Sequence, residues 1–365
     1  KSKDIDSPAL MFQWLGTFHS VANRLLRVHA EQIGLDPSFS IIDRSDAADM
    51  IDICRHQLGY SSMTKRFPNK TTCLNIYSRC VNAQQPLESI VRSFFPSCSD
   101  WNDELKALFK AYAQLKLQQL SLDYDDLLLY WYHMAAEPII AEQLRAKFDH
   151  ILVDEYQDTN LLQAQILLRL FPDGNGLTVV GDDAQSIYSF RSAEIDNILK
   201  FPEHFTPPAT VISLTKNYRS TQPILDLSNA LLRDGKNGYK NYLYSDKPSH
   251  IKPLLVSVED DESQCQYVVE QILKSREEGT ALKRQVVLFR SSHHTDRLEL
   301  ELQRRNIPYR KHGGLKFLEA AHVKDLLSTL RWADNPKHRI SGFRVLKMLP
   351  GVGPKSAEKI LDYLA

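Results

Sequence analysis

The stretch VVGDDAQSIYSFRSA, residues 179–193, begins with two valines and a glycine and continues with two adjacent carboxylates. Side chains of four different kinds follow closely: Gln185, Tyr188, Phe190 and Arg191. A β-branched run that ends in glycine and acidic residues predicts the carboxyl end of a strand, where ligands of parallel α/β sheets bind. The aromatic faces suit the stacking of unpaired bases, and packing in a protein core is the alternative.

Two sequence patterns alternate through the second half of the chain. The β-branched runs are HILVDEY (150–156), LTVVGDD (177–183), TVISL (210–214), PLLVSVE (253–259) and QVVLFRS (285–291). Helical patterns lie mostly between them, at residues 160–171, 221–232, 262–277 and 295–306. This alternation predicts parallel sheets in doubly wound α/β domains.

The first half of the chain is predicted to be mostly helical. Apolar spacing and capping residues indicate helices within residues 15–34, 43–59, 101–120 and 123–137. Residues 61–99 are expected to be less regular because three prolines interrupt them. After a boundary at residues 336–339, a pair of helices is expected around LPGVGPKS.

Composition and charge narrow the class of protein. Of the 365 residues, 43% are hydrophobic and 25% are charged, as in an ordinary soluble protein of two or three domains. No apolar run is long enough to predict a membrane span, and no signal peptide is expected. Lysine plus arginine and aspartate plus glutamate both number 45, but residues 283–316 and 331–365 are locally basic. Such regions suit a polyanion or a solvated helix face.

The five cysteines show no Cys-x-x-Cys spacing, and an odd number does not suit a set of disulfides. Reduced thiols are therefore expected. The pairs His293–His294 and Cys73/Cys80 lack the further ligands that a metal site requires.

Asp154 and Glu155 directly follow an apolar run, at the expected carboxyl end of a strand. In a nucleotide-hydrolysing site, the first carboxylate can hold Mg²⁺ and the second can take a proton from the attacking water. A polar strand end is the alternative. Gln185 follows the next strand, and adjacent parallel strands would bring it to the same crevice. There it can orient the water or contact the terminal phosphate.

The segment LTKNYRST, residues 214–221, adds a third element after the next expected strand. Arg219 presents a fork of donors that suits a γ-phosphate, and Tyr218 can stack on adenine. An ordinary surface arginine is the alternative.

Together these segments resemble the UvrD/Rep/PcrA group of superfamily 1 DNA helicases, over nearly the whole chain from Gly16 to Ala365. The matching segments are GTFHSVANRLLR (16–27, motif Ib), LDYDDLL (122–128, motif Id), VDEYQDTN (153–160, motif II), VVGDDAQSIYSFRSA (179–193, motif III), LTKNYRST (214–221, motif IV) and residues 288–332 (motif IVa). Their order and spacing match those of the group as well.

The resemblance implies an α/β fold with two RecA-like, P-loop NTPase-type parallel-sheet domains. The first would comprise residues 1–42 and 119–214 and carry a helical insertion at 43–118. The second would begin at 215–335, and the start of its own helical insertion, with a turn like that of a helix-hairpin-helix, would occupy 336–365.

The resemblance also implies an ATP-dependent DNA helicase or translocase that moves 3′ to 5′ and uses ATP and Mg²⁺. Its partners would be single-stranded and duplex DNA in repair, replication or recombination, without a membrane. The location would be cytoplasmic, at the nucleoid in a bacterium. A non-catalytic DNA-binding module and the motor part of a helicase–nuclease remain as alternatives.

By resemblance, Asp154 and Glu155 form the Mg²⁺ site, Gln185 senses the γ-phosphate, and Tyr218 and Arg219 contact the nucleotide. The residues expected to contact DNA are Thr17, Phe18, His19, Ser20, Tyr188, Phe190, Arg191, Lys316, Gly351 and Gly353. Where the group has Gly-Trp or Arg-Trp, this chain has Ser189-Phe190, so weaker stacking is expected.

No stretch reads G-x-x-x-x-G-K-[ST], the loop that cradles phosphates in such enzymes. GVGPKS at 351–356 does not qualify, because a proline separates its glycine from its lysine and no strand precedes it. An internal fragment, without the Walker A loop and motifs V and VI and inactive alone, is therefore expected. The same Gly-Val-Gly turn can bind DNA phosphate through backbone N–H groups, with a plain helix cap as the alternative.

Overall fold

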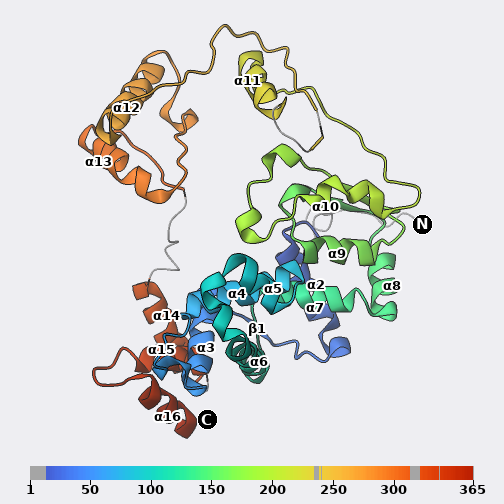
Figure 1. Cartoon of the computed structure of the whole chain (residues 1–365), viewed down its shortest axis with the longest axis vertical. Helices are drawn as coiled ribbons and strands as arrows, with labels where there is room; N and C mark the ends of the chain where they lie inside the picture. The colour runs from blue at the N-terminus through green and yellow to red at the C-terminus, as the bar shows by residue number, and fades with distance from the viewer. Residues whose placement is uncertain (1–13, 234–237, 240, 313–320, 337, 365) are drawn as a thin grey trace. The chain divides into compact units, whose positions relative to one another are not determined.

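The structure is a computed structural model that describes residues 14–233, 238–239, 241–312, 321–336 and 338–364 (Figure 1). The chain divides into two compact units. The first comprises Lys1–Asn217, Ser228–Tyr244 and Ser328–Ala365, and the second comprises Tyr218–Leu227 and Ser245–Leu327. Among the described residues, no helix is both long and apolar enough to cross a lipid bilayer.

The first unit contains most of the regular structure (Figure 1). Its helices are α2 (Phe18–His29), α3 (Arg44–Gln57), α4 (Lys70–Ala83), α5 (Leu87–Phe94), α6 (Asn102–Gln118), α7 (Tyr124–Met134), α8 (Pro138–Lys147), α9 (Leu161–Leu170), α10 (Asp196–Leu199), α15 (Arg339–Leu346) and α16 (Pro354–Leu364). Its strands are β1 (Ser40–Ile41), β2 (Ser121–Leu122), β3 (Ile151–Val153) and β4 (Leu177–Val179). Helices dominate, and all the strand pairs among the described residues are parallel.

Local capping explains where several of these helices begin. Asp43 caps α3 by accepting the backbone N–H groups of Ser45 and Asp46, and α7 and α9 each begin with a reciprocal capping box. Such caps satisfy backbone donors that have no partner within the helix. The predicted helices at residues 43–59, 101–120, 123–137 and 160–171 are confirmed with ends shifted by a few residues.

The prediction of an irregular segment at residues 61–99 is wrong, because α4 and α5 lie there. The prolines stand at helix starts and do not interrupt helices. Pro68 precedes the cap of α4, Pro86 occupies the cap position of α5, and Pro96 begins a 3₁₀ helix (Pro96–Trp101). Proline suits these positions because its missing N–H would have no helical partner there.

Helices α3, α4, α5 and α6, here called the α3–α6 bundle, share one apolar core that includes Met50, Ile76, Ile90 and Leu108. The two ends of the bundle are tied together by the short β1–β2 pair, in which Ser40 lies opposite Ser121 and Ile41 opposite Leu122. The chain therefore enters and leaves the bundle at neighbouring positions.

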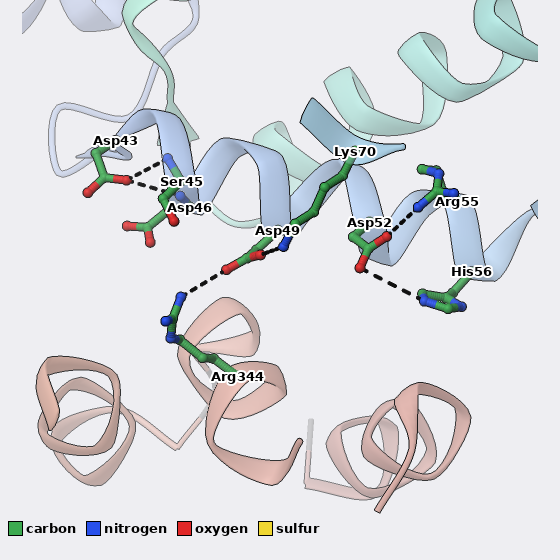
Figure 2. Close-up of polar contacts among 9 residues, drawn as sticks. All are labelled: Asp43, Ser45, Asp46, Asp49, Asp52, Arg55, His56, Lys70 and Arg344. Atoms are coloured by element: carbon green, nitrogen blue, oxygen red, sulfur yellow. Dashed lines mark hydrogen bonds and ion pairs between the residues drawn. The ribbon is translucent and has the colours of Figure 1, made fainter. Parts of the chain in front are cut away.

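Helices α15 and α16 pack on α3 and extend the same core with Phe343 and Leu361. Polar contacts accompany this packing on the acidic face of α3 (Figure 2). Asp49 accepts Lys70 of α4 and, at 3.3 Å, Arg344 of α15. Asp52, farther along α3, pairs with Arg55 on the same helix at 2.6 Å. The carboxylates of this helix are thus engaged in ion pairs.

Strands β3 and β4 form the sheet that positions the candidate site, with Ile151 opposite Leu177 and Val153 opposite Val179. Helix α9 connects the two strands and contributes residues to two apolar cores. Leu162 and Ile166 join α2 and α7, while Leu167 joins Val153. This is the strand–helix–strand arrangement expected from residues 150–183.

In the second unit, α12 (Asp261–Glu277) and α13 (Asp296–Arg304) pack around Val269, Leu298 and Leu302. Helices α11 (Gln222–Arg233) and α14 (Ala321–Asp334) extend across the boundary between the units. The predicted helices at 221–232, 262–277 and 295–306 are confirmed.

Three predicted strands are absent from the structure. Residues 210–214, 253–259 and 285–291 are all described, and none of them is a strand. Their apolar side chains are largely exposed, with Leu255 at 98% and Leu288 at 86%. A β-branched run becomes a strand only when a neighbouring strand satisfies its backbone groups, so composition alone misled the prediction.

Candidate functional site

Asp154 and Glu155 follow β3 directly, and both carboxylates are exposed at its carboxyl end. The loops after β3 and β4 meet at this edge, because Tyr156 N–H donates to the Val180 carbonyl over 2.9 Å. Glu155 has a φ of 51°, in the left-handed region that side chains other than glycine seldom adopt. Asp154 Oδ1 accepts the N–H of Glu155 at 2.9 Å. The two carboxylates are thus held at a sharp turn.

A chain of hydrogen bonds joins Glu155 to Gln185. Gln157 Nε2 donates to Glu155 Oε2 over 2.7 Å, and Gln157 Oε1 accepts the N–H of Asp182 at 3.0 Å. Asp182 Oδ2 in turn accepts Gln185 Nε2 at 2.8 Å. The structure therefore brings the acidic pair and Gln185 into one polar network, here called the Glu155–Gln185 network.

Gln157 is the central member of this network and was not predicted from the sequence. Its side chain is only 1% exposed, which is unusual for glutamine. The available signal was a polar amide two residues after an acidic pair. Gly181 is required beside it, because a Cβ there would lie 2.5 Å from Gln157 Oε1 and 2.7 Å from Ile198 Cδ1.

The donor set at this edge fits a hard divalent cation that keeps most of its ligands as water and phosphate oxygens. Mg²⁺ is commonly bound in this way by one or two carboxylates. Among the described residues, no group of three or more His, Cys, Asp or Glu side chains could hold a metal. Asp158 lies nearby, and burial together with the charge of Glu155 raises its pKa.

The aromatic side chains of the opening stretch lie on the surface. Residues Ser189–Arg191 form a short 3₁₀ helix, and the rings of Tyr188 and Phe190 lie 5.8 Å apart. Phe190 is 65% exposed, so core packing does not account for it. The side chain of Arg191 lies outside the described part of the structure. Most of Phe190 is therefore at the surface, where a base could contact it.

The segment at Thr17–Ser20 starts α2. Thr17 caps the helix, since its Oγ1 accepts the N–H of Ser20 at 3.3 Å. Phe18 is half-buried, with its ring 6.0 Å from that of Trp131, whereas His19 meets the edge of Tyr124 at 5.7 Å. Burial lowers the pKa of His19, which favours the neutral imidazole. Phe18 thus has a packing role that was not predicted from the sequence.

The other predicted contacts lie elsewhere. Tyr218 and Arg219 belong to the second unit, where Tyr218 is exposed and the Arg219 carbonyl accepts Lys247 Nζ at 2.9 Å. Gly351 and Gly353 lie between α15 and α16, and the φ of 79° at Gly351 explains the use of glycine. Lys316 lies outside the described residues.

Comparison with known proteins gives two family matches. Residues 3–206 match the UvrD/REP helicase N-terminal domain, and residues 212–364 match the UvrD-like helicase C-terminal domain.

Curated relatives match along most of the chain. An ATP-dependent DNA helicase PcrA of Staphylococcus epidermidis is 33% identical over 354 residues, which are 96% of this chain and 47% of the relative. A probable DNA helicase II homolog of Mycoplasma capricolum is 31% identical over 352 residues, 96% of this chain and 48% of the relative. The chain thus spans about half the length of the curated relatives it matches.

Proposed function

Because this chain belongs to the UvrD/Rep family of helicases, we propose that it forms part of an ATP-dependent DNA helicase that translocates 3′ to 5′ along a single strand. The two matched regions would be the two RecA-like domains, each with a helical insertion, and the α3–α6 bundle would be the first insertion. Single-stranded and duplex DNA would be its partners in repair, replication or recombination.

The Glu155–Gln185 network is the observation that carries this proposal. It connects the acidic pair after β3 to the loop after β4, and that same loop continues into the exposed rings of Tyr188 and Phe190. A nucleotide bound at Asp154 and Glu155 would therefore be connected through hydrogen bonds to the segment that contacts single-stranded DNA. Such a link is what a motor needs to convert hydrolysis into movement.

Each side chain of the network then has a role. Asp154 would hold Mg²⁺, which neutralises charge on the phosphate oxygens when it is bound. Glu155 would accept the proton of the attacking water, with Gln157 fixing the orientation of its carboxylate. Gln185 would contact the γ-phosphate and, through its hydrogen bond to Asp182, connect it to the loop after β4. In the second unit, Arg219 and Tyr218 would supply a phosphate contact and an adenine contact.

Glu155→Gln tests the hydrolytic role in a protein that spans the full length of the relatives. The substitution removes the base but keeps the shape, so DNA-stimulated ATP hydrolysis should fall by at least ~100-fold while ATP binding stays within about twofold. Steady-state ATPase assays and binding of a fluorescent ATP analogue measure the two quantities. Asp103→Asn, on an exposed surface of α6, is the matched control.

Unchanged hydrolysis in Glu155→Gln would refute the assignment of the base. If the unsubstituted protein binds single-stranded DNA but shows no ATP turnover, the non-catalytic DNA-binding alternative is the correct one.

A further inference from the structure

The loop that begins with Asp154 and Glu155 is hydrogen-bonded at its end to the end of the segment that carries Tyr188 and Phe190. Asn160 and Ala193 form an antiparallel bridge, and Glu194 N–H donates to the Thr159 carbonyl over 3.0 Å. Asn197 Nδ2 adds a bond to the same carbonyl at 2.9 Å. Residues 159–160 are thus a junction between the Glu155–Gln185 network and the segment that presents Phe190.

Asn82 connects the α3–α6 bundle to this junction by a hydrogen bond. Helix α4 lies against α9, and Asn82 of α4 accepts Asn160 Nδ2 at 2.7 Å through its Oδ1. Both asparagines are only 8% exposed. Asn160 Oδ1 is used at the same time to cap α9, where it accepts the N–H of Gln163 at 2.8 Å. Both ends of the Asn160 amide therefore have a defined partner.

Asn82 is itself held from two sides. Its Nδ2 donates to Asp125 Oδ1 on α7 at 2.7 Å and to the Ser78 carbonyl on α4 at 2.8 Å. The Asn82 amide can accept from Asn160 through its oxygen and donate to Asp125 through its nitrogen at the same time. A buried pair of this kind is directional, since the wrong group would leave a donor or acceptor without a partner.

We propose that Asn82 is a positioning residue. Through Asn160 it couples the α3–α6 bundle to the segment that carries Tyr188 and Phe190, the proposed contacts to single-stranded DNA. This inference rests on the proposed function only in treating Tyr188 and Phe190 as strand contacts. A shift of α4 moves Asn82, which pulls on the junction at residues 159–160 and so on the segment that begins at Tyr188. The bundle thereby adjusts how the aromatic rings are presented, although it contributes none of them.

The donor–acceptor pattern allows a specific disruption and a specific rescue. Asn160→Asp keeps an oxygen to cap α9, and aspartate is a good cap, but it places an acceptor against Asn82 Oδ1. Adding Asp125→Asn lets the Asn82 amide turn over, so that its Nδ2 faces the new aspartate and its Oδ1 faces the new asparagine. In the turned position Asn82 Oδ1 also faces the Ser78 carbonyl, which had accepted Nδ2, so the double variant should restore the link to residue 160 only in part.

Hydrogen exchange of the chain without DNA, read by mass spectrometry, tests the coupling. Asn82→Ala and Asn160→Asp should accelerate exchange of residues 186–199 by about fivefold, the change that corresponds to one ordinary hydrogen bond. The double variant Asn160→Asp/Asp125→Asn should return toward the unsubstituted rate. Ile76→Val, in the core of the bundle on the same helix, is the control and should leave residues 186–199 unchanged.

Unchanged exchange at residues 186–199 in both single variants would overturn the proposal, as would an equal acceleration by Ile76→Val, because that would show general loosening. Binding of a labelled oligothymidylate gives a separate reading. Asn82→Ala should weaken it by a few-fold, and Ile76→Val should not. If the unsubstituted chain does not bind the oligonucleotide, the proposed function fails, while the exchange measurement still decides the coupling.

Discussion

Gly181 stands at a position where a larger residue would collide with the candidate site. A Cβ there would meet the Gln157 amide oxygen and Ile198, and it would also lie 3.2 Å from the Tyr156 backbone nitrogen. The shape of the loop after β4 therefore requires glycine because of close approach by neighbouring atoms rather than because of backbone freedom. This single position controls whether Gln157 can reach both Glu155 and the N–H of Asp182.

Gly181→Ala is expected to destabilise the chain by ~1–3 kcal/mol, because the added methyl group forces the neighbouring side chains out of their packed positions. Urea unfolding measures the loss. Gly353→Ala is the control, because a Cβ there has no neighbour within 4 Å, and it should change stability little. Equal stability of Gly181→Ala and the unsubstituted chain would contradict the close packing.

Phe190→Ala separates stacking from charge. If the exposed ring stacks on a base, its removal should weaken single-strand affinity by ~1–3 kcal/mol and leave the slope of log affinity against log salt unchanged. Lys316→Ala should instead flatten that slope by roughly 0.7, the contribution of one phosphate contact. Filter binding at several salt concentrations distinguishes the two. An unaltered affinity of Phe190→Ala at every salt concentration would remove this residue from the strand-binding surface.

At the scale of elements, a buried ionic cluster joins α6 to the start of α7. Lys116, almost fully buried, lies 2.7 Å from Asp123 and 2.6 Å from Asp126. Burial lowers the pKa of Lys116, but the charges of both aspartates outweigh this and raise it. Burial, followed by the charge of Asp123, raises the pKa of Asp126 to about 7. The cluster thus connects the α3–α6 bundle to α7, and its contribution to the unfolding free energy depends on pH.

Asp126→Asn should make stability less dependent on pH. The folded state binds the Asp126 proton more tightly than the unfolded chain, whose ordinary pKa is 3.8, so the unfolding free energy falls as pH rises from 3.8 to about 7. Asparagine cannot ionise and keeps an oxygen for Lys116. The unfolding free energy of the variant, measured relative to that of the unsubstituted chain, should therefore be higher at about pH 8 than at about pH 4.

Urea unfolding at several pH values tests this expectation, with Asp103→Asn as the exposed control. A pH slope that is the same in Asp126→Asn and the unsubstituted chain would show that Asp126 stays ionised in the folded state.

At the scale of the whole molecule, the two units differ in how completely their apolar residues are covered. The described residues of the first unit form three apolar cores, which include Val153 of β3 and residues of most of its helices, although the run at 210–214 in this unit is exposed. The described residues of the second unit form one small core around α12 and α13, and the runs at 253–259 and 285–291 expose most of their apolar side chains. Within the part of the chain that the structure describes, the α/β pattern is therefore present as a strand–helix–strand element in the first unit and as helices in the second.

The sequence alone determined the features that depend on neighbouring residues. Capping residues and Gly59 indicated the ends of α3, and helical spacing indicated α7 and α9, because these patterns span only a few positions. The same holds for the acidic pair after β3 and Gln185 after β4, since a strand followed by a polar turn is a local pattern. The family could likewise be inferred, because its motifs are short and occur in a fixed order.

Only the tertiary structure decided which distant residues meet. Asn82 and Asn160 are 78 positions apart, and nothing in either segment indicates that their amides pair. The packing of α15 on α3 and the burial of Gln157 are equally non-local. The runs at 210–214, 253–259 and 285–291 show the converse, because strand formation requires a partner that a local pattern does not contain. Local propensity therefore predicted the helices, whereas pairing across the chain determined the sheet and the network of the site.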